Sequence, residues 1–174
     1  MSNTAITYSS LHLPLCEVVL RALSADDLRA LEWQGGADLR GFYEDLWRAH
    51  AAEEIHVVVA DFNQFPIGLA VIHWPGKPTQ PGVPDIQSLR VHPIFRGLKI
   101  GSALMSSCEQ LIAARGFSKV GLSVGLENLG AKKLYQRSDY EVDGAPYCDV
   151  WYYTDAAGKS VCVEEHVLDL VKNL

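Results

Sequence analysis

Short apolar runs rich in β-branched residues recur along the chain, and several show the two-residue alternation of a half-buried strand. The run beginning at Asp85 is ended by Pro93, because proline cannot donate to a β-ladder. These runs predict strands at Glu17–Leu23, Ile55–Phe62, Ile67–Trp74, Asp85–His92, Lys119–Val124, Tyr140–Val142 and Asp149–Thr154. Ile55–Trp74 is expected to form a hairpin around Asn63-Gln64.

Two terminal segments allow more than one structure. Residues 1–14 are a loose arm or a short extra strand. Val161–Val171 is most simply a closing strand, but its apolar residues also fit the spacing of a terminal helix.

Apolar residues at three- and four-residue spacing predict helices between the strands. Ser24 caps the first, with acids in its first turn, and Gly35-Gly36 ends it. The others are a helix capped by Asp38, a central helix from Ile100 to near Arg115, and Asn128–Arg137.

The resulting order of elements predicts a mixed α/β fold, with helices on both faces of one sheet. The length of 174 residues fits a single domain over residues 1–174. A loop at Pro75–Pro84, with four prolines and two glycines, precedes the strand at Asp85 and is expected to border a substrate cleft.

Composition narrows the classes of function. A net charge of −6 disfavours nucleic-acid binding and mildly favours cationic partners such as amines. The four cysteines and six histidines show no metal-ligand or disulfide spacing, so we expect no metal site and reduced thiols. No signal peptide and no membrane-spanning run is recognised, which favours a cytoplasmic protein.

The segment after the strand at Asp85 carries the clearest chemistry. Arg96, Gly97 and Gly101 form a basic, glycine-containing loop that opens directly into the central helix. The first N–H groups of a helix lack internal partners and favour anions, and glycine lets the backbone approach a ligand closely. This arrangement predicts binding of a phosphorylated ligand.

These residues resemble the GNAT superfamily of N-acetyltransferases. The pattern VHPxxRGxxIG begins at Val91, and NxxAxxxY begins at Asn128. The resemblance implies a mixed, mostly antiparallel sheet whose two central parallel strands, here Asp85–His92 and Lys119–Val124, splay apart around pantetheine. It also implies acetyl-CoA as co-substrate, held by Leu89, Arg90, Val91, Arg96, Gly97, Leu98, Lys99, Ile100, Gly101, Ser102, Asn128, Ala131 and Tyr135.

Two positions depart from the family pattern. Lys99 replaces the central glycine of the loop, and its backbone N–H and charge still suit phosphate. Asp139 replaces the glycine that leaves the helix with positive φ, a conformation that aspartate tolerates better than most residues.

The resemblance also implies catalytic roles. Tyr135 matches the tyrosine that protonates the leaving CoA thiolate, and without the resemblance it would be an ordinary core aromatic. Asn128 matches a residue that bonds pantetheine or water, and it is equally a helix N-cap. A backbone N–H near Val91, where the family's strand bulges, is expected to polarise the acetyl carbonyl.

The general base is open. Gln87 stands in the catalytic position where many family members have glutamate, and it cannot accept a proton. Asp85 lies two residues earlier on the same strand face and is the substitute, although a solvated residue at the strand entry is the plainer interpretation. Glu53, Glu54, His92 and a chain of waters are alternatives.

Aromatic residues with nearby acids suit a small cationic amine as acceptor, although many of them also suit an ordinary core. The aromatics are Trp33, Phe42, Tyr43, Trp47, Tyr147, Trp151 and Tyr152, and the acids are Glu44, Asp45, Asp143 and Asp149. Acetylation of a protein N-terminus or lysine, and a non-catalytic acyl-CoA-binding module, remain alternatives. An exposed last strand would allow a homodimer.

Overall fold

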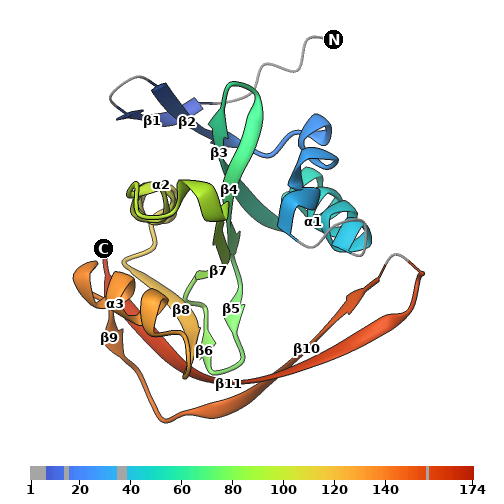
Figure 1. Ribbon diagram of the computed structural model, residues 1–174. Helices are drawn as coiled ribbons and strands as arrows, with labels where there is room; N and C mark the ends of the chain where they lie inside the picture. The colour runs from blue at the N-terminus through green and yellow to red at the C-terminus, as the bar shows by residue number, and fades with distance from the viewer. Residues whose placement is uncertain (1–6, 14–15, 35–38, 156) are drawn as a thin grey trace.

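The computed structural model, described here for residues 7–13, 16–34, 39–155 and 157–174, is built on a nine-stranded sheet (Figure 1). The order across the sheet is β1-β2-β3-β4-β7-β8-β11-β10, and β9 (Glu141–Val142) pairs with β11 off this path. The strands are β1 (Thr7–Leu13), β2 (Cys16–Ala22), β3 (Ile55–Phe62), β4 (Phe65–His73), β7 (Asp85–Val91), β8 (Lys119–Gly125), β10 (Tyr147–Thr154) and β11 (Ser160–Asn173).

One seam of this sheet is parallel. β7 and β8 run in the same direction and pair at Asp85 and Gly121, and the other recorded pairings in the described chain are antiparallel. Beyond that pair the two strands have no recorded register, so their carboxyl halves part. The expected mixed sheet with splayed central strands is therefore confirmed.

Both faces of the sheet are covered because β3 and β4 are mostly apolar and are buried at nearly every position. Val58, Ala60 and Ile72 face α2 (Ile100–Ala114), whose Leu104 and Cys108 lie in the same core. The alternate residues, such as Val57 and Val59, pack with Tyr43 of α1 (Arg40–Ala51) on the other face. Helices on both faces follow directly from these two-sided apolar strands.

The segment after β2 differs from the expected helix. The Ser24 capping box is present, but the chain forms two short 3-10 helices, η1 (Ala25–Asp27) and η2 (Ala30–Gln34). Asp27 is buried and binds the Arg21 guanidinium, which also binds Asp61. This bidentate ion pair fixes Asp27 against β2, and the chain turns instead of continuing as one helix.

The structure adds detail to the sequence predictions at the start of α1 and in the loop before β7. Gly35, Gly36 and Asp38 lie outside the described residues, and α1 follows Leu39 without a side-chain cap. The loop at residues 75–84 contains a small hairpin of β5 (Gly76–Lys77) and β6 (Gln80–Pro81).

The last segment is a strand, so the helical alternative is wrong. β11 lies between β8 and β10, and its first half, 160–167, pairs with β10 while its second half, 167–173, pairs with β8. The expectation of an exposed last strand is also wrong, because β10 is the outer strand at this end of the sheet. At the other end, β1 supplies the extra strand expected near the N-terminus.

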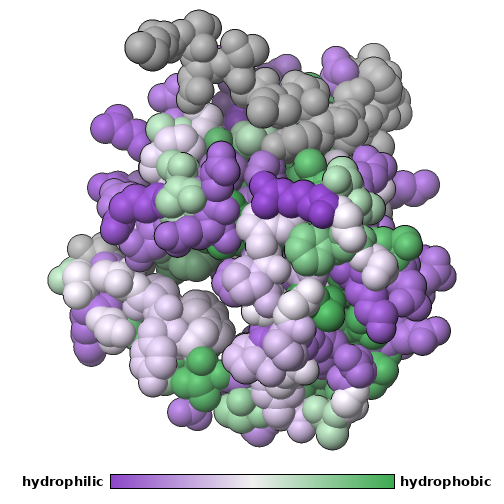
Figure 2. All heavy atoms as spheres, turned by 180° about the vertical axis from the view of Figure 1, so that it is seen from behind, coloured by the Kyte–Doolittle hydropathy of each residue, from purple (hydrophilic) through white to green (hydrophobic). Residues whose placement is uncertain are grey.

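The β10–β11 hairpin reaches away from the sheet and back toward α1 (Figure 1). A Cβ on Gly41 of α1 would lie 2.9 Å from the Thr154 carbonyl oxygen, so the hairpin tip rests directly on this helix. From behind, an open gap separates the hairpin from the body (Figure 2). The hairpin is thus anchored at both ends and arches over the space between them.

The loop that enters α2 contains two residues with positive φ. Gly97 has φ +81°, and Lys99, the helix N-cap, has φ +64° without a side-chain capping bond. Asp139 also has positive φ, at +63°, as expected for a residue that replaces glycine. Lys99 bears the usual penalty for a residue with a Cβ in the left-handed region.

Replacing Lys99 with glycine should therefore stabilise the protein. We expect the free energy of unfolding to rise by about 0.5–1 kcal/mol, because relief of the left-handed conformation exceeds the added entropy of the unfolded chain. Urea denaturation measures the change. The control is Ser102→Gly within the first turn of α2, which should lower stability by a similar amount; a loss of stability in both variants would contradict the argument.

Candidate active site

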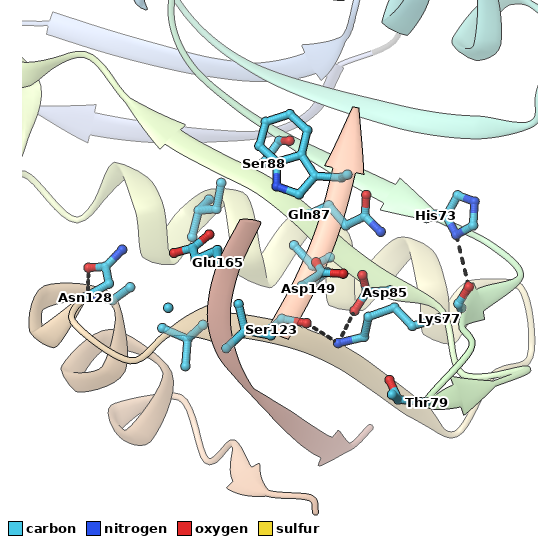
Figure 3. A pocket seen from close by; sticks show the side chains of 18 of the residues that line it. His73, Lys77, Thr79, Asp85, Gln87, Ser88, Ser123, Asn128, Asp149 and Glu165 are labelled. Carbon is cyan, nitrogen blue, oxygen red and sulfur yellow. Dashed lines mark hydrogen bonds and ion pairs between the residues drawn. The ribbon is translucent and has the colours of Figure 1, made fainter. Parts of the chain in front are cut away.

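A cavity of about 770 Å³ opens between the splayed halves of β7 and β8. Residues of the β10–β11 hairpin and of the loop before β7 line it (Figure 3). Phe42 of α1 forms a further wall. Residues expected from the sequence to act in catalysis and in ligand binding lie together on the wall of this cavity. They are Asp85, Gln87, Leu89, Arg90, Asn128, Ala131 and Tyr135.

A buried lysine, Lys77, forms part of the cavity wall. Lys77 Nζ donates to Ser123 Oγ at 2.5 Å and to Asp169 Oδ1 at 2.7 Å, and it lies 3.2 Å from Asp85 Oδ1. Its side chain is only 10% exposed. Tyr147 and Ser123 also donate to Asp169 Oδ1, at 3.0 and 2.8 Å. One cation thereby joins the small β5–β6 hairpin to β7, β8 and β11.

The two carboxyl groups around Lys77 respond differently to it. Burial raises the pKa of Asp85, and the opposing effects of Lys77 and Gln87 do not cancel the increase. Burial also acts to raise the pKa of Asp169, but bonds from Lys77, Thr79 and Ser123 outweigh it and hold that pKa below its usual value. Asp169 is therefore the firm counter-ion, while Asp85 accepts a proton more readily than a surface aspartate does.

Asp85 is not a solvated residue at the strand entry. It is 1% exposed, and its Oδ1 accepts no hydrogen bond of good geometry within the described chain, although Lys77 is close. A buried carboxyl with a raised pKa, an unfilled acceptor atom and a position on a cavity wall is a candidate general base.

Tyr135 and Asn128 lie on α3 (Leu129–Arg137) and at its start. Tyr135 is 8% exposed, and burial, together with the negative charge of Asp85, raises the pKa of its phenol to about 12. It therefore stays protonated at neutral pH and can donate a proton into the cavity. Asn128 accepts from Ala131 N–H at 3.0 Å, so its expected N-cap role is confirmed.

The irregularity expected in β7 lies earlier than Val91. The pairing with β4 shifts between Gln87 and Arg90, and Ser88 has φ +51°. Ser88 and Leu89 together thus oppose Ala70, as in a β-bulge. A bulge turns backbone N–H groups out of the ladder, so Ser88 and Leu89, which line the cavity, add candidate amides to the one expected near Val91.

The remaining candidates divide by position. Glu53, Glu54 and His92 are not among the residues that line the cavity, whereas Phe42, Tyr147, Asp149, Trp151 and Tyr152 are. Tyr43 is buried in the core beside the Arg90 side chain, and the Trp33 ring packs at a tilt against His92. The acceptor wall is therefore made by α1 and the β10–β11 hairpin, with fewer aromatics than expected.

The loop residues from Arg96 to Ser102 lie at the N-terminus of α2, outside the cavity lining. Arg96 Nε donates to the Val91 carbonyl at 3.0 Å, which leaves its terminal nitrogens exposed. Ile100 is buried in the core, so only its backbone N–H can serve a ligand. An uncapped helix start beside an exposed arginine suits a phosphate group.

The sequence did not identify three residues that line the cavity, namely Lys77, Ser123 and Glu165. It also did not identify Asp169, which binds Lys77. Asp169 left one signal, an acid inside the apolar run Val167–Val171. Within the described residues, no group of three or more histidines, cysteines and acids is placed to hold a metal ion, and no helix is long and apolar enough to cross a membrane.

Comparison with known proteins agrees with this geometry. The family model described as "Acetyltransferase (GNAT) family" matches residues 22–140. An uncharacterized N-acetyltransferase of Methanocaldococcus jannaschii is 34% identical over 85 residues, which are 48% of this chain. The match spans 38% of that relative, and the chain likewise spans 38% of the other curated relatives that it matches.

Solved structures show the same fold at low identity. A ribosomal-protein-alanine N-acetyltransferase from Brucella melitensis superposes with a TM-score of 0.67 at 16% identity, over 89% of this chain and 99% of its own. A GNAT family acetyltransferase from Elizabethkingia anophelis with acetyl-CoA bound gives 0.59 at 16% identity, over 90% and 98%.

Removing the buried cation should destabilise the protein strongly. For Lys77→Met we expect the free energy of unfolding at pH 7 to fall by about 3 kcal/mol, because two buried carboxylates lose their shared partner. Urea denaturation gives the value. The control Arg48→Met breaks an exposed pair with Asp45 and should cost less than about 0.5 kcal/mol.

The loss of unfolding free energy caused by Lys77→Met should depend on pH in a defined direction. Asp169 has a lowered pKa in the fold, so its stabilising contribution is present at neutral pH and is lost as pH falls. The difference between the parent and Lys77→Met should therefore be full above about pH 5 and shrink as the pH falls from about 5 toward 3. A constant difference across that range would contradict the charge network.

Proposed function

The chain belongs to the GNAT family of acetyltransferases, and on that premise we propose that it moves an acetyl group from acetyl-CoA to a primary amine of a small molecule by direct attack. One observation carries the proposal. The cavity between β7 and β8 places Asp85 and Tyr135, a candidate base and a candidate acid, on the walls of the same space.

The cofactor-binding part of the proposal rests on the loop before α2. Arg96, the N–H groups from Gly97 to Ser102 and the positive end of the helix supply donors for the pyrophosphate. The carboxyl half of β7, including Leu89, Arg90 and Val91, and the start of α3 would flank pantetheine. Acetyl-CoA bound in a relative of the same fold supports this arrangement.

The chemistry assigned to the side chains follows their pKa values. When bound, acetyl-CoA supplies the acetyl group, and CoA leaves as a thiolate. Asp85 accepts the proton that the amine loses as its nitrogen bonds to the acetyl carbon. Backbone N–H groups at the Ser88–Arg90 bulge stabilise the charge on the carbonyl oxygen. Tyr135 donates its phenolic proton to the departing sulfur and recovers a proton from solvent.

Gln87 has a supporting role in this scheme. It lines the cavity beside Asp85 and acts against the rise of that residue's pKa. An amide cannot take up the amine proton, but it can orient the carboxylate or the amine. We therefore assign it to positioning.

A small acceptor is favoured over a protein acceptor by the β10–β11 hairpin. The hairpin crosses the cavity and its tip rests on α1, which limits the length of chain that can lie in the site. Acetylation of a protein N-terminus or lysine is the second candidate, and the gap beside the hairpin is the route it would need (Figure 2). A non-catalytic module would bind acetyl-CoA without releasing thiol in the presence of any amine.

The proposal extends to assembly and location. The exposed side chains of Val150 and Tyr152 lie on β10, whose outer edge is unpaired within the described sheet. A second copy could add its own edge there and form a homodimer. We place the protein in the cytoplasm, in keeping with cysteines that show no disulfide spacing.

Arg96→Ala should weaken acetyl-CoA binding about tenfold, because one charge-assisted contact with phosphate is lost. Calorimetric titration with acetyl-CoA, and with free CoA for comparison, measures the dissociation constant. Arg137→Ala, which removes an exposed arginine at the far end of α3, is the control and should bind like the parent. Equal affinity in both variants would remove Arg96 from the site.

Tyr135→Phe should lower kcat about 100-fold while leaving acetyl-CoA affinity nearly unchanged, because only proton donation to the thiolate is removed. Thiol release measures turnover, and calorimetry measures binding. With its pKa near 12, the phenol of the parent should remain an active donor up to about pH 10. Tyr140→Phe, a buried neighbour whose ring centre lies 6.0 Å away, is the matched control and should retain full turnover.

A further inference from the structure

Two carboxylates face each other on the inner side of the β10–β11 hairpin. Asp149 and Glu165 are directly opposite in the register of the two strands, and both line the cavity. Tyr147 and Trp151, the next inward residues along β10, lie on either side of Asp149 and line the same wall. Figure 3 shows Asp149 and Glu165 pointing into the cavity from these strands.

Neither carboxylate is neutralised within the described chain. No ion pair or hydrogen bond involves the carboxylate of Asp149 or of Glu165 among the residues the structure describes. The two cations on the cavity wall are engaged elsewhere, since Lys77 binds the Asp85 cluster and Arg90 lies 5.4 Å above the Phe42 ring. Like charges placed directly across two strands destabilise the pairing.

Gly125 of β8 makes room for one of them. A Cβ at this position would overlap Glu165 Oε1, so the carboxylate lies flat against the end of β8. A larger residue there would push the carboxylate away from the cavity wall. The observed position of the Glu165 carboxylate thus depends on glycine at position 125.

An independent observation marks the deep end of the cavity. Asp85 is 1% exposed and lines the cavity, and its Oδ1 accepts no hydrogen bond within the described chain. Lys77 Nζ is within reach, but it is shared with Asp169 and Ser123. With all three groups ionised, the Asp85–Lys77–Asp169 group carries one net negative charge, so the cavity wall is anionic here as well.

The two anionic ends are a short distance apart. The Glu165 carboxylate lies beside Gly125, and Ser123, two residues earlier on the same side of β8, touches Lys77 and Asp169. Two residues of a strand span about 7 Å. That separation matches an extended chain of four to six methylene groups, and the aromatic rings of Tyr147 and Trp151 offer such a chain an apolar wall.

We propose that Asp149 and Glu165 bind the second ammonium group of a dicationic acceptor, an aliphatic diamine or polyamine, while its other amine is acetylated beside Asp85. The inference rests on the proposed acetyl transfer and names its substrate class. A cation between the two carboxylates removes their repulsion, and its charge-assisted bonds add selectivity over a monoamine.

The first test compares acceptors of equal length. The parent should acetylate 1,4-diaminobutane and 1,6-diaminohexane with a kcat/KM at least tenfold above that for 1-aminobutane and 1-aminohexane. In the Asp149→Asn/Glu165→Gln double variant this preference should disappear. The kcat/KM for the diamines should fall, while that for the monoamines stays unchanged. Glu164→Gln, which removes a charge from the outward face of the same strand, should keep the preference.

A binding measurement separates this inference from the proposed function. Calorimetric titration of 1,4-diaminobutane into the CoA-saturated protein should show binding in the parent and in Glu164→Gln, with a loss of at least tenfold in the double variant. That loss supports the inference even if no amine is turned over, whereas absent turnover together with absent acetyl-CoA binding removes the proposed function itself.

Thermal unfolding adds a readout that an ordinary structural pair would not give. The double variant should melt up to about 3 °C higher than the parent, because the like-charge pair is gone. The diamine should raise the melting temperature of the parent and not of the double variant. Equal use of diamines and monoamines by the parent, or a preference that survives in the double variant, would overturn the inference.

Discussion

The contact between Lys77 and its two buried carboxylates holds together the part of the sheet that has the weakest backbone pairing. β7 and β8 meet at one recorded residue pair, Asp85 and Gly121, and then diverge. The gap between them is bridged by a side chain, since Lys77 reaches Ser123 on β8, Asp169 on β11 and Asp85 on β7. The cavity exists because the backbone parts there, and it keeps its shape because the lysine limits how far.

The same contact sets the chemistry of the cavity. Asp85 remains close enough to a cation to be held in place, yet it is buried deeply enough for its pKa to rise. Its charge, after burial itself, contributes to the raised pKa of Tyr135. One buried ion cluster therefore accounts for the raised pKa of both Asp85, the candidate base, and Tyr135, the candidate acid. The hairpin carboxylates add an anionic surface that this cluster leaves uncompensated.

Elements that depend on neighbouring residues could be predicted from the sequence, whereas contacts between residues far apart in the chain could not. Alternation and helical spacing identified the strands and helices, and the loop at Arg96–Gly101 identified the helix start that suits phosphate. The Ser24 cap was correct, but the helix beyond it was not, because Asp27 is held by Arg21 and, through it, by Asp61. Lys77 gave no signal, since a lysine in a proline- and glycine-rich loop has no periodicity that could place it 92 residues away beside Asp169.

That separation has a consequence for how the protein folds. The core around α1, β3 and β4 forms from segments close in sequence, whereas the Lys77–Asp169 contact closes one of the longest loops in the chain. Loop-closure entropy places such contacts late in folding. Until β11 docks, β8 is an unpaired edge and Lys77 faces only Asp85, so the intermediate exposes a strand that other chains can join. We therefore expect the cavity to be among the last regions to form.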